Sequence, residues 1–500
     1  METKDLANIR GTARDDIKAH FVFIPLMLQG HLIPAVDTAL LLASHGALTS
    51  IVVTPSYTER VHRTIDFAKK SGLPVRLMEF PLDLAAEGLP DGADDVDKVP
   101  PHLIANYFRA LANLREPLER YLRSDEPYPT CVVADICHPW VKELAAKLEV
   151  PRLSFSVTCA FSLLCQHNVE RFNAYDGIAD DHELVVVPGL EKKIELSRAQ
   201  SLIFFRLMPG FEKFTDELEQ AVVKADGMLV NSFQEMEPQY VAGYAEARRM
   251  KVWTVGPVSL FHQSTTTLSS RGNTTAIGAD VCQHWLDGMV ANSVVYVSFG
   301  SIQYVEPKQV IELGLGLEAS GHPFIWVVKN ADLLGEEVKE FLRELETRVA
   351  GRGLLIMGWA PQVLILSHAA VGSFVTHCGW NSTMEAIAAG LPVVAWPHFS
   401  EQFLNAKLAV EVLGIGVDVG VTEPVMLRYD QKVIVIRREM VEKAVRSIMD
   451  RGDEGEERRR RARALAAKAR AAVVEGGSSH ANLQDLVNHF QRGPARGAAA

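Results

Sequence analysis

Two polar side chains follow predicted strands in the first half of the chain, where they could perform acid–base chemistry. His31 comes shortly after the apolar run at 20–25 and lies where a helix, predicted over 33–45, begins. Its ordinary pKa of about 6.5 suits a general base. Asp135 directly follows the run at 131–134 and could orient the imidazole and stabilise it once protonated. Each also has a structural interpretation, because a lone histidine is more often structural and an aspartate there often caps a helix starting at 138.

A second group of polar residues occurs within residues 359–402. This stretch predicts two strand–loop–helix units, with strands at 371–375 and 391–396 and a helix at 384–389. In a parallel sheet the carboxyl ends of strands are where ligands bind. A helix start preceded by Gly379 offers free backbone N–H groups and a positive dipole end, which suit a diphosphate.

Structural interpretations of the same stretch stay open from the residues alone. Ser382-Thr-Met-Glu385 has the form of a capping box, which satisfies helix-end N–H groups without a ligand. Trp359 on its own would more often be a core residue than a platform for a base. His377 beside Cys378 could suggest a metal, but no second ligand pair stands at a useful spacing. We therefore expect no metal site.

The order of these residues resembles a known signature. WAPQ at the start, HCGWNS and a later Glu inside, and EQ at the end resemble the nucleotide-sugar motif of plant secondary-product UDP-glycosyltransferases (family 1). The match runs without gaps over 44 residues and is far more specific than a lone glycine pattern. The resemblance extends over nearly the whole chain. It implies the GT-B fold, in which two Rossmann-like domains face a central cleft, and a UDP-sugar co-substrate with no further cofactor.

The resemblance also assigns roles to the residues of this motif. Those it places on the nucleotide are Trp359 and Gln362 at the uracil, Glu385 at the ribose hydroxyls, and His377, Asn381 and Ser382 at the diphosphate, with Ala360 and Gly379 in the same site. It places Trp380, Glu401 and Gln402 on the sugar hydroxyls. Many members have Asp where this chain has Glu401, and Gln402 in place of His points to glucose over galactose.

The first half also has counterparts in the family. A Gly-His after the first strand serves as the base there, and an Asp before an aromatic-rich helix is its partner; His31 and Asp135 match these positions. Thr158 maps to a threonine near the primary hydroxyl of the sugar. The Ser-Phe-Gly-Ser turn at 298–301 makes Gly300 and Ser301 candidate diphosphate ligands through backbone N–H and hydroxyl groups.

Composition sets the limits of these hypotheses. Five hundred residues, 48% hydrophobic and 23% charged, predict a soluble globular chain of two or three domains. The net charge of −11 argues against a nucleic-acid partner, so local dipoles and hydrogen bonds must bind phosphate. Six cysteines without a C-x-x-C pair favour reduced thiols in a cytoplasmic protein. The start of the chain does not resemble a secretory signal and no apolar run suits a membrane span, so we expect no membrane insertion. We also expect a monomer.

Strand and helix patterns alternate in both halves, as in doubly wound parallel sheets. The stretch at 262–278 is polar, small and without period, which is typical of a linker. The predicted boundaries are a disordered tail at 1–17, an acceptor-binding domain at 18–258, a linker at 259–280, a UDP-sugar-binding domain at 281–475, a helix crossing back to the first domain at 476–492, and a disordered tail at 493–500.

The predicted reaction is a single displacement with inversion that moves a sugar, glucose above all, to a small lipophilic plant metabolite such as a flavonoid, another phenolic or a terpenoid. We expect no diphosphate-bound metal, so dipoles, His377 and Ser301 should carry the charge of the leaving group. We expect segments 82–101 and 175–210 to line the acceptor pocket. A non-catalytic nucleotide-sugar-binding protein and C-glycosyl transfer are the alternatives. An NAD-dependent oxidoreductase is excluded, because no G-x-G-x-x-G motif follows the first strand of this chain.

Overall fold

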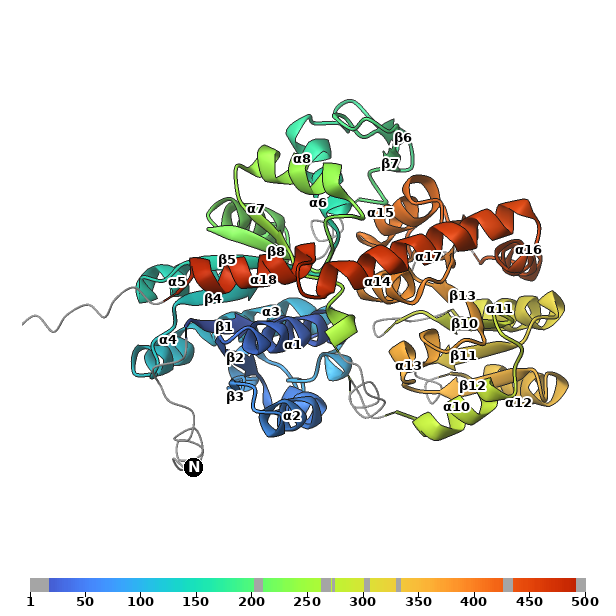
Figure 1. Cartoon of the computed structure of the whole chain (residues 1–500), viewed down its shortest axis with the longest axis horizontal. Coiled ribbons are helices and arrows are strands. Elements are labelled where there is room, and N and C mark those ends of the chain that lie inside the picture. The colour runs from blue at the N-terminus through green and yellow to red at the C-terminus, as the bar shows by residue number, and fades with distance from the viewer. Residues whose placement is uncertain are drawn as a thin grey trace, which may run out of the picture.

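Two parallel sheets form the two halves of the protein (Figure 1). The computed structural model describes residues 18–201, 210–261, 271, 275–300, 306–329, 334–425 and 435–491. Ser301, a predicted diphosphate ligand, lies outside these residues. The fold confirms the predicted class, because helices cover the faces of both sheets and each sheet holds its strands in crossover order.

The first sheet has seven strands in the order β3-β2-β1-β4-β5-β8-β9, all paired in parallel. Its central strands are runs of apolar residues buried along their whole length, as expected for strands covered on both faces. The strands are β1 His20–Ile24, β2 Leu48–Val53, β3 Val75–Glu79, β4 Cys131–Asp135, β5 Arg152–Ser156, β8 Gly227–Val230 and β9 Val252–Thr254. A separate antiparallel pair joins β6 Leu184–Val186 to β7 Glu195–Ser197.

The second sheet has six parallel strands in the order β12-β11-β10-β13-β14-β15. The strands are β10 Val294–Ser298, β11 Phe324–Val328, β12 Gly353–Met357, β13 Val371–Thr376, β14 Val393–Ala395 and β15 Gly416–Asp418. The central strand β10 pairs with both β11 and β13, so β10 and β13 end side by side near the cleft.

The helices of the first half are α1 Gln29–Ser44, α2 Pro55–Lys70, α3 Ile104–Ala112, α4 Arg115–Arg123, α5 Val141–Leu148, α6 Ala160–Arg171, α7 Phe214–Val223 and α8 Pro238–Arg248. Its short 3₁₀ turns are Ala85–Glu87, Val96–Lys98, Pro101–Leu103 and Val258–Phe261. The helices of the second half are α10 Ala279–Asp287, α11 Pro307–Ser320, α12 Glu336–Arg348, α13 Gln362–Leu366, α14 Trp380–Ala389, α15 Gln402–Lys407 with a π turn at Leu408–Val412, α16 Arg438–Met449 and α17 Asp453–Val473.

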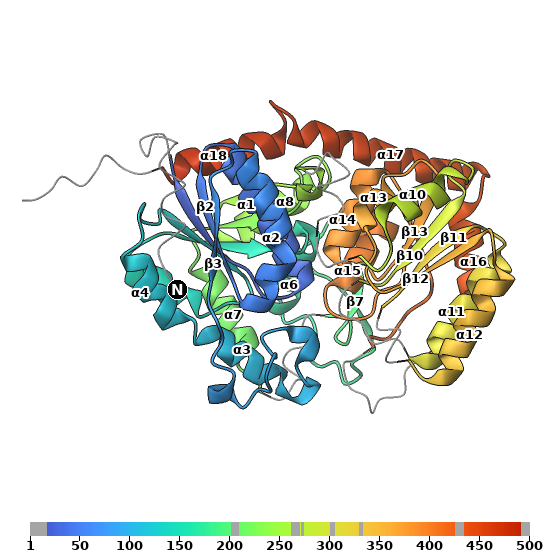
Figure 2. The ribbon, with the colours of Figure 1, turned by 90° about the horizontal axis from the view of Figure 1, so that it is seen from below.

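The last helix, α18 Ser478–His489, lies on the first half although it follows the second half in sequence (Figures 1 and 2). Asp485 accepts hydrogen bonds of 2.6 Å from the indole N–H of Trp253 and from Nζ of Lys251, both at strand β9. Ser479 donates to the carbonyl of Gly256 at 2.6 Å. The C-terminal segment therefore ties the two halves together.

Two helices begin earlier than the sequence pattern predicts. Helix α1 begins at Gln29 instead of 33, and α14 begins at Trp380 instead of 384. The polar residues of both first turns resemble loop residues, but they are helical residues whose side chains line a cavity. Gly379 is the N-cap of α14, so Ser382 lies inside the helix and the capping-box interpretation is wrong.

All six cysteines are free and buried. Within the described parts of the chain, no helix is both long and apolar enough to cross a membrane.

Candidate active site

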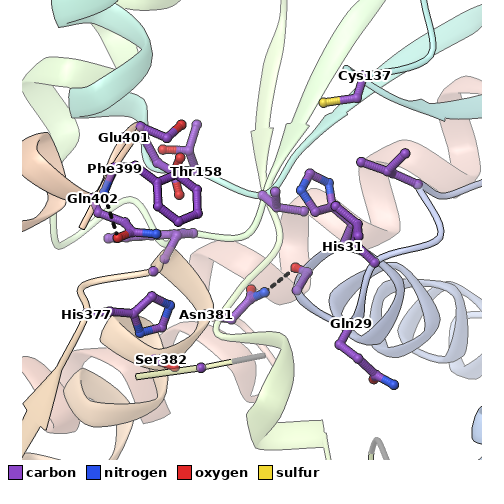
Figure 3. A pocket seen from close by; sticks show the side chains of 18 of the residues that line it. Gln29, His31, Cys137, Thr158, His377, Asn381, Ser382, Phe399, Glu401 and Gln402 are labelled. Atoms are coloured by element: carbon purple, nitrogen blue, oxygen red, sulfur yellow. Dashed lines mark hydrogen bonds between the residues drawn. The ribbon is translucent and has the colours of Figure 1, made fainter. Parts of the chain in front are cut away.

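A cavity of about 910 Å³ lies between the two sheets and is lined from both halves. The predicted site residues that line it are His31, Thr158, Gly300, Trp359, Ala360, Gln362, His377, Gly379, Trp380, Asn381, Ser382, Glu385, Glu401 and Gln402. Figure 3 shows His31 on one side of this cavity, with His377, Asn381 and Gln402 opposite. Asp135 is not part of the lining, because it lies behind His31 with a fully buried side chain.

His31 and Asp135 form a hydrogen-bonded pair although 104 residues separate them. Strands β1 and β4 are neighbours in parallel register, so the turn after β1 and the end of β4 meet at one edge of the sheet. Nδ1 of His31 lies 2.7 Å from Oδ2 of Asp135. The other oxygen of Asp135 accepts from the backbone N–H of Cys137 at 2.9 Å. Because α5 begins at Val141, Asp135 is not the N-cap of that helix.

The charges of this pair suit proton transfer. Burial lowers the pKa of His31, but the adjacent Asp135 carboxylate raises it more, and the net pKa lies above the ordinary value. Burial raises the pKa of Asp135, whereas His31 lowers it, with a net decrease. An ionised carboxylate can only accept, so Nδ1 of neutral His31 carries the proton and Nε2 keeps a free lone pair. Nε2 is therefore the atom that could act as a base.

The ring of His377 is held between two glycines. A Cβ atom at Gly300 would lie 2.5 Å from Cε1 of His377, and one at Gly379 would collide with Nε2. Gly300 also has φ +81°, which L side chains rarely adopt. Burial lowers the pKa of His377 to about 4, so the imidazole is neutral at pH 7. It can donate one hydrogen bond to a diphosphate but adds no positive charge.

The start of α14 is attached to the first half of the protein. The indole N–H of Trp380 donates to the carbonyl of Asn231 at 2.7 Å, and the amide of Asn231 donates to Oδ1 of Asn381 at 3.3 Å. The amide of Asn381 donates to the carbonyl of Gly30, next to His31. These bonds fix the nucleotide motif relative to the proposed base. Asn231 has no special signal in the sequence, because its contacts with Trp380 and Asn381 join the two halves.

Both carboxylate oxygens of Glu385 have partners within the protein. Its Oε2 accepts from Nε2 of Gln362 at 2.8 Å, and its Oε1 pairs with Arg271. Arg271 also binds Asp37 of α1, with Nη2 at 2.8 Å from Oδ2. All three side chains of this Asp37–Arg271–Glu385 triad are less than 10% exposed. A ribose that binds Glu385 must therefore share the carboxylate with Arg271 or replace it.

No pattern in the sequence predicts this triad. Arg271 lies in the predicted linker among serines, threonines and glycines, and Asp37 lies within an apolar helix. An arginine in such a stretch would normally be a solvent-exposed residue.

The opposite end of the motif lies near the start of α15. Oε1 of Gln402 accepts from the backbone N–H groups of His398 at 2.9 Å and Phe399 at 3.2 Å. This fixes the amide so that its NH₂ group remains available as a donor. Thr158 is buried at the cavity wall, and its hydroxyl has no hydrogen-bond partner among the described residues. These groups suit the hydroxyls of a sugar.

The acceptor side of the cavity is mostly apolar. Within the predicted segment 82–101 it is lined by Val96, Asp97, Val99 and Pro101, whereas residues 175–201 contribute nothing to the lining, so that prediction is wrong there. Residues 202–209 are not described. Helices α3, α6 and α7 supply other walls, including Phe108, Leu163 and Val222.

Comparisons with known proteins agree with this geometry. The family model for UDP-glucoronosyl and UDP-glucosyl transferase matches residues 279–430, and the model for the glycosyltransferase N-terminal domain matches residues 18–260. The chain is 42% identical over 487 residues to UDP-glycosyltransferase 73D1 of Arabidopsis thaliana, covering 94% of this chain and 96% of the relative. It is 41% identical to UDP-glycosyltransferase 73C12 of Barbarea vulgaris, with 95% and 96% covered.

Solved structures show the same architecture. Glycyrrhiza uralensis UGT73P12, complexed with glycyrrhetinic acid 3-O-monoglucuronide, matches with a TM-score of 0.87 and 36% identity over 95% of this chain and 96% of that one. Phytolacca americana UGT2, complexed with UDP-2fluoro-glucose and pterostilbene, matches with a TM-score of 0.73 and 26% identity over 94% and 99%. The chain belongs to the plant family 1 UDP-glycosyltransferases and has the GT-B fold.

Proposed function

We propose that this enzyme transfers glucose from UDP-glucose to a hydroxyl group of a lipophilic plant metabolite, with inversion at the anomeric carbon. The observation that supports this most is the His31–Asp135 pair at 2.7 Å, whose imidazole lines the same cavity as the nucleotide motif. One cavity can therefore hold the donor and the acceptor together, as a single displacement requires.

In the proposed mechanism Nε2 of His31 takes the proton of the acceptor hydroxyl as its oxygen attacks the anomeric carbon. The imidazolium that forms is stabilised by the ionised Asp135. The bond from the anomeric carbon to the diphosphate oxygen breaks on the opposite face, and UDP leaves with the electron pair. The backbone N–H groups at the start of α14 and the neutral His377 would stabilise the departing charge.

Two further observations support the choice of substrates. The NH₂ group of Gln402 can donate to a sugar hydroxyl, because the other end of its amide is held by backbone N–H groups. The apolar walls of the cavity suit a lipophilic acceptor. Relatives with solved structures were complexed with a terpenoid glycoside and a stilbene, which supports a phenolic or terpenoid acceptor for this enzyme.

An acceptor screen tests the proposal. The enzyme is incubated with UDP-glucose and a panel of phenolics and terpenoids, and products are identified by mass spectrometry. We expect β-glucosides that a β-glucosidase hydrolyses. Products that resist acid and glucosidase would indicate C-glycosyl transfer, the alternative reaction. His31→Ala should abolish turnover, whereas His62→Ala, an exposed histidine of α2, should leave it unchanged.

A further inference from the structure

A third reactive side chain stands beside the proposed catalytic pair. Cys137 follows Asp135 by two residues, is 8% exposed and lines the cavity. One ligand atom each from His31, Asp135 and Cys137 lie within 4.8 Å of one another. Figure 3 shows Cys137 on the same side of the cavity as His31. The proposed mechanism gives this thiol no role.

Imidazole nitrogen, carboxylate oxygen and thiolate sulfur are all zinc ligands. Zinc sites with three protein ligands keep an open fourth position, and bonds of about 2.0–2.3 Å place tetrahedral ligands roughly 3.3–3.8 Å apart. To bind zinc, Nδ1 of His31 and Oδ2 of Asp135, now 2.7 Å apart, must therefore move farther apart. Pairs of ligand atoms in the cluster that are now up to 4.8 Å apart must approach each other by about 1 Å. Side-chain rotations of this size do not require the strands to move.

The charges of this cluster also favour a divalent cation. A divalent cation bound at this cluster would displace the proton of the Cys137 thiol, as it does at other thiolate sites. The cation, the ionised Asp135 and the thiolate then sum to zero charge, with the imidazole neutral. A neutral cluster is far less costly to bury than a free charge.

We propose that His31, Asp135 and Cys137 form an inhibitory binding site for zinc and similar thiophilic divalent cations. A cation at Nδ1 of His31 replaces the proton that Asp135 holds there, and in a neutral imidazole the proton must then reside on Nε2. Nε2 loses its free lone pair and can no longer accept the proton of the acceptor. The metal is thus a competitor of the base and takes no part in the reaction.

The effect on rate rests on the proposed function, whereas binding does not. The first experiment measures glucoside formation against zinc concentration for wild type, Cys137→Ala and Cys165→Ala, the last being a buried thiol of α6 outside the cluster. We expect the zinc concentration for half inhibition to rise at least about tenfold in Cys137→Ala and to stay unchanged in Cys165→Ala. A chelator should restore the wild-type rate. Equal inhibition of all three enzymes would overturn the proposal.

The second experiment detects binding without turnover. Cobalt replaces zinc in a titration of the full-length protein, followed by the thiolate-to-cobalt charge-transfer absorption. Wild type should give this absorption with one cobalt per chain, and Cys137→Ala should not; His31→Ala should bind more weakly. Absence of the absorption in wild type overturns the site even if the variants do not fold. If His31→Ala stays active but the cobalt absorption is present, the base assignment is wrong and the metal site stands.

Discussion

The two walls of the cavity are built in opposite ways. On the second half, the motif residues come from one stretch of 44 residues, whose strands β13 and β14 and helices α13 and α14 present them in sequence order. On the first half, the proposed catalytic pair is assembled from positions 104 residues apart, and only the pairing of β1 with β4 brings them together. The wall on the second half can be identified in the sequence as a motif, whereas the wall on the first half can be identified only when the sheet topology is known. We expect the wall on the second half to bind the donor and the wall on the first half to transfer the proton, so substitutions on the two walls should have different effects.

The largest effect on turnover is expected on the wall of the first half. Asp135→Asn should lower kcat by about 10³-fold, because an amide can hold the wrong tautomer of His31 and does not stabilise its cation. The Michaelis constant for UDP-glucose should stay nearly the same. Steady-state kinetics with the best acceptor of the screen measures both.

A double variant provides the control for this prediction. His31→Ala combined with Asp135→Asn should be no slower than His31→Ala alone, because the two residues act as a unit. Additive losses would show that Asp135 acts independently of the imidazole.

A substitution on the wall of the second half should weaken donor binding. Gly300→Ala should raise the Michaelis constant for UDP-glucose roughly 100-fold, about 2.7 kcal/mol of binding, because the new Cβ displaces the ring of His377. The acceptor constant should change little. Gly321→Ala is a matched control, since Gly321 also has a positive φ but nothing lies within 4 Å of its Cβ position. If both substitutions weaken donor binding equally, the close contact between Gly300 and the ring of His377 does not determine donor affinity.

The triad connects the two walls and should affect stability. Arg271→Ala leaves Asp37 and Glu385 buried without their cation, which should cost about 3 kcal/mol of folding free energy. Thermal unfolding followed by circular dichroism should show a lower Tm. Adding Asp37→Asn should recover part of the loss, because it removes one of the two unpaired charges; no recovery would contradict a buried triad.

Sugar selectivity should change less. Gln402→His should lower kcat/KM for UDP-glucose by about fivefold and raise the relative use of UDP-galactose, because a hydrogen bond of about 1 kcal/mol is lost or redirected. Competition between the two donors, analysed by chromatography, gives the ratio. Glu401→Asp, which keeps the carboxylate with one methylene fewer, should keep the wild-type ratio.

The smallest effect is a shift in pH dependence. The base must be neutral to accept a proton, so kcat/KM should fall as pH decreases through the pKa of His31. Because Asp135 raises that pKa, the acidic limb should lie above the ordinary value of about 6.5. Asp135→Asn should move the limb to lower pH in its residual activity. A limb that stays in place would assign it to another group.

Features that depend on neighbouring residues could be predicted from the sequence, whereas contacts between distant parts of the chain could not. The motif residues, the fold and most strands follow from local patterns, because apolar runs and glycines determine the backbone nearby. His31 and Asp135 were identifiable through their positions after strands and through the family resemblance. The early starts of α1 and α14 were missed, since polar side chains that face a cavity resemble those that face water. Arg271 and Asn231 could not be found, because their partners at the cavity lie far away in the sequence and no spacing in the chain encodes those contacts.

The most direct test measures donor binding and chemistry separately in His31→Ala. Calorimetry gives the Kd for UDP-glucose, and a rapid-quench single turnover gives the rate of glucoside formation. We predict an unchanged Kd and a rate reduced by at least about 100-fold. A variant that keeps the wild-type single-turnover rate, or one that loses donor affinity in proportion to its rate, would contradict the division of labour between the two walls.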